Sequence, residues 1–241
     1  MSGLLYRADP YQSTAEAEVI AHTPEGGVVL SQTVFYPTGG GQPGDSGQLL
    51  WSEGVMNVAT TVRDRHVAER IALVPDASRP LPAIGTTVLQ RLDWTRRYRH
   101  MRLHTALHLL SVVIPLPVTG GAIGADKARL DFDMPEMPDD IAPLEAALNA
   151  MVDRDLPVNE DWITQAQLRA RPELVKSASV QIPASVGPLR LVRIGQGGDL
   201  VDLQPCGGTH VARLGEIGRL RLGRIEMKGR QNRRVYLHLD A

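Results

Sequence analysis

The apolar and polar positions of residues 1–92 alternate over short runs, a pattern that predicts β-strands rather than helices. The string YPTGGGQPGDSG within this region has too many glycines and prolines for a helix interior. We therefore expect a small β-barrel-like domain over residues 1–92. The strand candidates are Val28–Leu30, Thr33–Tyr36, Gly54–Val62, Arg65–Leu73 and Thr86–Leu92.

The pattern changes at Asp93, which can cap a helix over the segment DWTRRYRHMRLHTALHLLSVVI that ends before Pro115. Apolar residues at helical spacing predict a second helix near Ile141–Val152, and a short helix is expected near Ile163–Ala170. Helices beside antiparallel strands indicate an α+β domain over residues 93–241. Its strand candidates are Ala128–Phe132, Leu189–Ile194, Leu200–Leu203, Ile217–Ile225 and Arg234–Leu239.

The composition is that of a globular protein, with 241 residues, 43% hydrophobic and 22% charged. No segment approaches the run of about 20 apolar residues that crosses a bilayer. The N-terminal sequence lacks the features of a secretion signal. We therefore expect a cytoplasmic protein that does not associate with membranes. The single cysteine excludes an intramolecular disulfide.

Positive charge is concentrated in two places, although the net charge of the chain is only −1. The segment from Arg213 to Arg234 contains eight basic residues and two acidic ones. A second cluster, before a pair of histidines, comprises Arg96, Arg97, Arg99 and Arg102. Such clusters can bind phosphates, although a solvated surface is the commoner explanation for either one alone.

The histidine pair consists of His104 and His108, which lie four residues apart in the first predicted helix. This spacing puts both imidazoles on one helix face, where two nitrogens can approach one zinc ion. A histidine on a mostly apolar face is more often a core residue. His100 extends the same spacing backwards, so the spacing alone leaves the choice of pair open.

The segment PCGGTH supplies the chemistry that the histidine pair lacks. It places the only cysteine, Cys206, four residues before His210, with two glycines between them that permit a tight turn. A lone cysteine is usually a small buried apolar residue, but such a residue does not need flanking glycines. The two half-sites together predict one zinc ion bound by three or four side chains.

HTALHLL and CGGTHV together resemble the editing domain shared by alanyl-tRNA synthetases and the freestanding AlaX family. YPTGGGQPGDSG, DKARLDFD, GEIGRLRL and KGRQNRRVYL are similar to further motifs of this family, in the same order. The resemblance implies one Zn²⁺ held by His104, His108, Cys206 and His210, with His100 outside the set. It also implies a stand-alone editor that keeps the N-terminal β-domain, since no aminoacylation module is evident.

The function implied by the resemblance is hydrolysis of mischarged tRNA(Ala), chiefly Ser-tRNA(Ala) and also Gly-tRNA(Ala). The partner would be the acceptor stem and 3′ end of the tRNA, and no obligate protein partner is expected. Order along the chain suggests that the amino-acid pocket is lined by Thr119, Gly120 and Gly121. The residues expected to contact tRNA phosphates are Arg97, Arg102, Arg230, Arg233 and Arg234.

Two questions stay open at this point. Four protein ligands are typical of a closed structural zinc site, whereas a catalytic zinc keeps an open position, so His210 could act on water instead. Two other functions fit the same residues. One is an editor of a different mischarged tRNA, of the threonyl type, and the other is a non-catalytic, zinc-stabilised tRNA-binding module.

Overall fold

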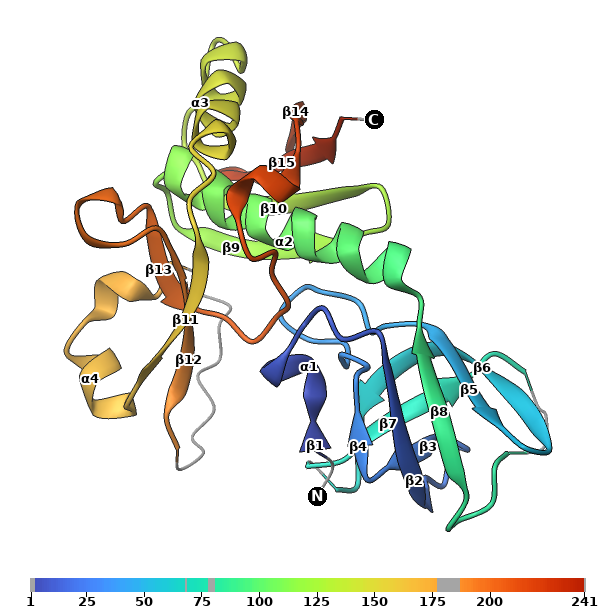
Figure 1. The fold of residues 1–241 in the computed structure, drawn as a ribbon. Coiled ribbons are helices and arrows are strands. Elements are labelled where there is room, and N and C mark those ends of the chain that lie inside the picture. Colours follow the sequence, from blue (N-terminus) through green and yellow to red (C-terminus); the bar gives the residue numbers. More distant parts are fainter. Residues whose placement is uncertain (1–2, 68, 78–80, 177–186, 241) are drawn as a thin grey trace. The chain divides into compact units, whose positions relative to one another are not determined.

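The structure is a computed structural model, and it divides into two compact units, Met1–Arg99 and His100–Ala241. These are called here the N-terminal and C-terminal units, and each is described by itself (Figure 1). Helix α2, Trp94–Val113, contains the boundary between them. The residues that the structure describes are 3–67, 69–77, 81–176 and 187–240.

The N-terminal unit is built around a closed barrel with the strand order β2-β3-β7-β6-β5-β8. All neighbouring pairs with a recorded register are antiparallel. Closure removes exposed strand edges, and the predicted barrel-like domain is confirmed. The strands are β2 (Thr14–His22), β3 (Val28–Leu30), β5 (Gly47–Trp51), β6 (Gly54–Arg63), β7 (Ile71–Pro75) and β8 (Thr87–Leu92). Outside the barrel lie β1 (Gly3–Leu4), α1 (Leu5–Ala8) and β4 (Gln32–Thr33).

Two of the strands predicted in the N-terminal unit are much shorter than expected. The strand predicted at Thr33–Tyr36 ends at Thr33, because the Val34 N–H donates to the side chain of Gln90 instead of to a neighbouring strand. The strand predicted at Arg65–Leu73, of which residue 68 is outside the described residues, begins at Ile71. Before it, the Asp64 carboxylate accepts the backbone N–H groups of the next turn.

The glycine-rich turn between β4 and β5 is closed by a buried ion pair. The Tyr36 N–H donates to the Asp45 carboxylate over 2.6 Å, and the Asp45 N–H donates back to the Tyr36 carbonyl. Arg97, from the first turns of α2, is fully buried, and its Nε donates to both Asp45 oxygens, at 3.1 and 3.0 Å. The same guanidinium donates to the carbonyls of Pro10 and Val34. Asp45 and Arg97 therefore connect this turn to α2.

In the C-terminal unit, α2 runs across a four-stranded antiparallel sheet with the order β14-β15-β10-β9 (Figure 1). Asp93 caps the helix as predicted, since its carboxylate accepts the Arg96 N–H at 3.1 Å. Helix α3 (Ala142–Asp153) borders β14, where the Asn149 side chain exchanges two hydrogen bonds with the Leu220 backbone. The strands are β9 (Val118–Ile123), β10 (Lys127–Asp133), β14 (Leu220–Met227) and β15 (Asn232–Leu239).

A second sheet of the C-terminal unit, with the order β11-β12-β13, has its own small core. One face of the sheet packs against helix α4 (Gln165–Arg169) and the 3₁₀ turn Pro172–Leu174. Leu191 of the sheet clusters there with Leu168 of α4 and Leu174 of the turn. The strands are β11 (Val158–Ile163), β12 (Leu189–Ile194) and β13 (Asp202–Pro205), and the remaining 3₁₀ turns are Gly197–Asp199 and Leu214–Ile217. This mixture of helices and antiparallel sheets confirms the predicted α+β class. Among the described residues, no helix is both long and apolar enough to cross a bilayer.

Candidate metal centre

The first half of the candidate site lies on α2. His104 and His108 are one turn apart on the same helix face, with ring centroids separated by 5.7 Å. Both are nearly inaccessible, at 6% and 5% exposure. The apolar residues around them on α2, among them Leu103 and Leu107, are buried as well. The two imidazoles are therefore held in the interior of the C-terminal unit, where a polar side chain needs a partner.

The second half follows β13, at the point where Cys206 leaves the sheet. The Cys206 N–H still donates to the carbonyl of Arg190 on β12, at 3.2 Å. Gly207 has open space where a side chain would be, and neither Gly207 nor Gly208 adopts a positive φ. The turn therefore does not depend on a left-handed backbone, and what Gly207 provides is the absence of a side chain beside Cys206.

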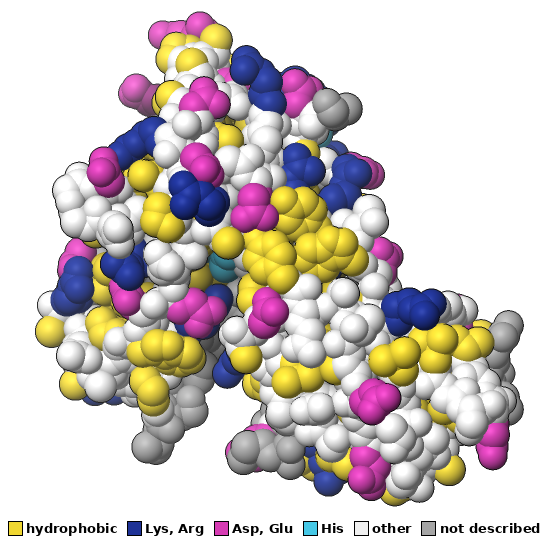
Figure 2. All heavy atoms as spheres, in the orientation of Figure 1, with side chains coloured by type: hydrophobic (Ala, Val, Ile, Leu, Met, Phe, Trp, Pro, Cys, Tyr) yellow, Lys and Arg dark blue, Asp and Glu magenta, His cyan; other side chains and the backbone are white. Residues whose placement is uncertain are grey.

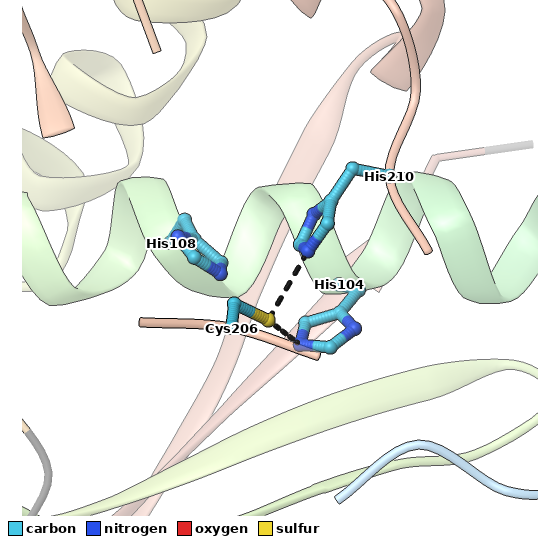
Figure 3. Close-up of side chains that lie close together, drawn as sticks. All are labelled: His104, His108, Cys206 and His210. Carbon is cyan, nitrogen blue, oxygen red and sulfur yellow. Dashed lines mark hydrogen bonds between the residues drawn. The ribbon is translucent and has the colours of Figure 1, made fainter. Parts of the chain in front are cut away.

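The two halves meet at one point, as Figure 3 shows: His104, His108, Cys206 and His210 direct their side chains toward one another. Their candidate ligand atoms all lie within 4.8 Å of one another. The Cys206 Sγ lies 3.4 Å from His104 Nε2 and 3.3 Å from His210 Nε2. Ligand atoms around a tetrahedral zinc are roughly 3.3–3.8 Å apart, given bonds of 2.0–2.3 Å. The donor set and the two distances from the Cys206 sulfur thus fit a zinc ion.

Hydrogen bonds on the outer side of the cluster orient His108. Its Nδ1 lies 2.8 Å from Asp202 Oδ2. Because an ionised carboxylate can only accept, we assign the proton to Nδ1, which leaves the Nε2 lone pair for a metal. Asp202 is itself held by Lys176 Nζ at 2.5 Å and by Gln204 Nε2 at 2.7 Å.

His210 is oriented in the same way by Thr105. The Thr105 hydroxyl donates to the Met101 carbonyl at 2.9 Å, so its lone pairs are left to accept. It accepts the Val211 N–H at 3.3 Å and lies 3.2 Å from His210 Nδ1. We therefore assign the proton to Nδ1 of His210 as well, so that its Nε2 faces Cys206.

The electrostatics of the metal-free cluster favour a thiolate. Burial would raise the pKa of the Cys206 thiol, but the charge and hydrogen bond of His104, with the hydrogen bond of His108, lower it well below its usual value. Burial lowers the pKa of His210 to about 3, so this ring is neutral. A thiolate and a neutral imidazole are the protonation states in which these side chains bind metals.

His108 differs from His210 because of its carboxylate partner. Burial would lower the pKa of His108, but its hydrogen bonds to Asp202 and Cys206 raise it to about 9. Burial would likewise raise the pKa of Asp202, but the bond to His108, together with the charge of Lys176, lowers it. In the absence of metal, His108 therefore carries a proton that metal binding has to displace.

The residues expected to line the amino-acid pocket lie on β9, the edge strand of the four-stranded sheet. The Thr119 hydroxyl lies 3.1 Å from the Asp131 carbonyl and 3.1 Å from Asn232 Oδ1. Gly121 pairs with Leu130 and is exposed. A side chain at Gly121 would meet Leu130 at 3.0 Å. The Thr119 hydroxyl is thus already hydrogen-bonded within the sheet.

Two of the five arginines expected to bind tRNA lie on α2, and both donate hydrogen bonds inside the protein. Arg97 has no exposed surface, and its guanidinium is bound by Asp45 and by two carbonyls. Its charge is neutralised within the protein, so the structure corrects the expectation that Arg97 contacts phosphate. Arg102 is half-buried and donates twice to the Ile217 carbonyl, at 2.9 and 2.7 Å.

The other three arginines lie on or beside β15. Arg234 makes a bidentate ion pair with Asp131 at 2.8 and 2.9 Å. Arg233 is 6% exposed and donates to the Gly229 carbonyl at 3.0 Å. Arg230 is exposed. On the face drawn in Figure 2, Lys and Arg side chains lie among Asp and Glu rather than in one block. Only Arg230 of these three is an exposed basic side chain.

Sequence reasoning missed the side chains that orient the cluster. Thr105 is adjacent to His104 in the helix motif, but nothing in the sequence distinguishes it from a packing residue. Asp202 lies four positions before Cys206, so the strand that leads into the CGGTH motif could have been searched for a carboxylate. Arg190 is separated from the motif by 16 positions and meets it only through the strand register.

Fold and cluster together define a class: an α+β protein with a closed barrel and a group of three buried histidines and one partly buried cysteine that could hold a metal ion. Residues 189–236 match the family described as threonyl and alanyl tRNA synthetase second additional domain. Residues 9–96 match the family described as tRNA synthetases class II (A). The two family matches thus cover parts of both units.

Relatives extend this likeness over the whole chain. The alanyl-tRNA editing protein AlaX-M of Methanosarcina acetivorans is 33% identical over 250 residues, covering 99% of both chains. That of Methanosarcina barkeri is 33% identical over 247 residues, with the same coverage. The alanine–tRNA ligase of Pyrobaculum calidifontis is 35% identical over 232 residues, which are 92% of this chain and 25% of the ligase. The chain belongs to the AlaX-M family of alanyl-tRNA editing proteins.

Proposed function

We propose that this protein is a zinc-dependent deacylase that removes serine, and also glycine, from mischarged tRNA(Ala). The observation that carries the proposal is the convergence of His104, His108, Cys206 and His210 within 4.8 Å. Full-length likeness to alanyl-tRNA editing proteins supports the substrate class. The partner would be the acceptor stem and 3′ end of the tRNA.

His104, His108 and Cys206 are the side chains proposed to hold the ion, because each offers a donor atom toward the centre of the cluster (Figure 3). Bound zinc supplies Lewis acidity for the ester carbonyl and lowers the pKa of water. His210 has two possible roles. It completes a four-ligand site, or its neutral Nε2 accepts the proton of the attacking water and leaves one metal position open.

His210→Ala separates these two roles. If His210 acts on water, the variant keeps stoichiometric zinc and loses deacylation. If His210 is a ligand, zinc is lost together with activity. Zinc content by metal analysis and single-turnover deacylation of the same preparation are the two measurements.

Selectivity is proposed to come from a pocket that recognises the serine hydroxyl. A site that binds alanine cannot strongly reject a smaller side chain or one that only adds a hydroxyl, so a second, hydrolytic site is needed. We propose Thr119, Gly120 and Gly121 as its lining. Thr119→Val should then reduce hydrolysis of Ser-tRNA(Ala) far more than zinc content, and unchanged hydrolysis would exclude Thr119 from the pocket.

Arg230, which is exposed, is proposed as the main phosphate contact. Arg102, Arg233 and Arg234 are proposed as weaker contacts, because each already donates hydrogen bonds to groups of the protein. Such contacts position the tRNA without reading its sequence, and they weaken with salt. Arg230→Gln should raise KM without changing kcat.

The central experiment is a panel of Ser-, Gly-, Ala- and Thr-charged tRNAs, each incubated with and without a zinc chelator. Hydrolysis of Ser- and Gly-tRNA(Ala), abolished by the chelator and restored by zinc, is the expected result. Preference for a Thr-specific substrate or for mischarged tRNA(Thr) would favour a threonyl-type editor. Binding of tRNA without hydrolysis of any member would favour a non-catalytic module.

A further inference from the structure

Arg190 on β12 makes an unusual set of contacts to the turn that carries the cysteine. Its Nη1 donates to two carbonyl oxygens of the CGGTH turn, Cys206 at 2.9 Å and Gly208 at 2.8 Å. Its Nη2 donates to Glu160 Oε1 on β11, at 2.7 Å. The Arg190 side chain is only 13% exposed. One guanidinium therefore connects β11, β12 and the turn.

These contacts act on the backbone on both sides of Gly207. Because the two carbonyls flank Gly207 and converge on one nitrogen, the peptide planes around Cys206 cannot rotate independently. The Arg190 carbonyl also accepts the Cys206 N–H at 3.2 Å, so Arg190 holds Cys206 through both main chain and side chain. With the peptide planes held, the direction of the Cys206 Cα–Cβ bond is held as well, and rotation about that one bond is the freedom left to Sγ.

The direction of that sulfur determines whether the cluster forms. Sγ lies 3.4 Å from His104 Nε2 and 3.3 Å from His210 Nε2, so a rotation that moves it by about 1 Å would break the arrangement. The residue preceding Cys206 is a proline, and the residue following it is a glycine without side-chain contacts. Both carbonyls that flank Gly207 accept from the Arg190 side chain.

We propose that Arg190 is a positioning residue for the metal centre, which holds the CGGTH turn so that Cys206 and His210 reach one ion together with His104. Glu160 in turn fixes the fork of Arg190. The consequence for hydrolysis rests on the proposed function, whereas the consequence for metal binding does not. Arginine is required because its planar fork donates in two directions at once, which a lysine ammonium on a flexible stem does not reproduce.

Arg190→Lys and Arg190→Gln test this, with Arg193→Gln as the matched control. Arg193 lies on the same strand but on the opposite face, where it pairs with Asp161 at 3.0 Å. Zinc affinity, measured by competition with a chromogenic chelator, should fall about 10–100-fold in both Arg190 variants. The control should stay within twofold of wild type.

Three further readouts distinguish positioning from general stability. The cobalt-substituted protein should lose or shift its thiolate-to-metal absorption band in Arg190→Lys. Cys206 is the only cysteine, so alkylation by a thiol reagent reports on it alone. The zinc concentration that protects it from alkylation should rise by the same factor as the affinity falls. Thermal unfolding of the metal-free protein should change little.

Zinc affinity within twofold of wild type, with an unchanged cobalt spectrum, in both Arg190 variants would overturn the proposal. If Arg190→Gln does not fold, Arg190→Lys and Glu160→Gln decide. Glu160→Gln keeps Arg190 but removes the charge that holds its guanidinium, so it should weaken zinc binding to a smaller extent.

Deacylation of Ser-tRNA(Ala) by the wild type is measured in parallel. If the wild type is inert but Arg190→Lys weakens zinc, the proposed function fails and the positioning role stands. A wild type that binds neither zinc nor cobalt overturns the positioning role directly.

Discussion

Two glycine-containing turns, one in each unit, are each held by an arginine, fully buried in the first and partly buried in the second, but serve different ends. In the turn Tyr36–Asp45, Arg97 meets a carboxylate that belongs to the turn itself, and no metal-binding side chain is left over. In the turn that follows β13, Arg190 meets only carbonyl oxygens. The side chains of Cys206 and His210 therefore remain available to the cluster (Figure 3).

The comparison shows that glycine content marks a turn but not its function. The two turns differ in what their arginine binds: a side chain of the turn in the first case, and only the backbone of the turn in the second. A buried carboxylate satisfied by an arginine is a stability element, and its removal is costly because a charge is left buried without a partner. A turn held through its backbone leaves its side chains available for chemistry.

Stability should change most when the Arg97–Asp45 ion pair of the first turn is removed. Arg97→Met leaves Asp45 buried without its counter-charge and should lower the free energy of unfolding by about 3–5 kcal/mol. Urea unfolding followed by tryptophan fluorescence measures the change. The exposed pair Arg154–Asp199 gives the control, since Arg154→Met should cost less than about 1 kcal/mol.

The zinc content of the same Arg97→Met variant shows whether the two turns act separately. Arg97→Met should retain stoichiometric zinc while it is folded, because Arg97 contacts the barrel turn and not the cluster. Loss of zinc without loss of stability would show that the two turns are not functionally distinct, and the comparison would fail.

The second effect concerns the other turn. Cys206→Ser replaces the thiolate donor with a hydroxyl and should weaken zinc binding by more than 100-fold, which corresponds to about 2.7 kcal/mol. Deacylation should be lost with it. Thr38→Val, in the glycine-rich turn of the barrel, is the control and should keep both zinc and activity. Zinc bound to Cys206→Ser with wild-type affinity would exclude Cys206 as a ligand.

The third effect concerns the carboxylate behind His108. Asp202→Asn removes the negative charge beside His108 Nδ1 and leaves one acceptor oxygen for His108, Lys176 and Gln204, so zinc affinity should fall about 10–100-fold. Asp161→Asn is the matched control, because Asp161 lies in the same sheet and pairs with Arg193 instead. Isothermal titration at one pH measures both variants. An equal loss in the two would mean that the sheet, and not the hydrogen bond to His108, sets the affinity.

The features that sequence could predict are those with a local signal. The helix over His104 and His108, its cap at Asp93 and the strand at Val28–Leu30 follow from spacing and capping chemistry, and all are present. The grouping of His104, His108, Cys206 and His210 needed the resemblance as well, since spacing alone left His100 as an alternative.

The features that sequence could not predict depend on long-range register. Arg190 reaches Cys206 because β12 pairs with β13, and Asp202 reaches His108 because the same sheet lies beside α2. Arg97 looked like a phosphate ligand because it belongs to a basic cluster on α2. Its carboxylate partner lies 52 positions away in the chain, and no local pattern connects the two.

A smaller change in stability is expected at Asp131, whose ion pairs hold neither turn. Asp131, on β10, accepts from Arg234 and Arg129; burial would raise its pKa, but these two partners lower it below the usual 3.8. A lowered pKa stabilises the fold above the unfolded value and loses that contribution as pH falls through the folded value. Asp131→Asn should therefore lower the free energy of unfolding by on the order of 1 kcal/mol at neutral pH, and the difference in Tm from wild type should narrow below about pH 4.

Asp133→Asn, at an exposed site on the same strand, is the control and should leave Tm unchanged. A difference in Tm that is independent of pH would mean that Asp131 acts through packing, and would leave the two arginine-held turns as the places where buried charge matters most.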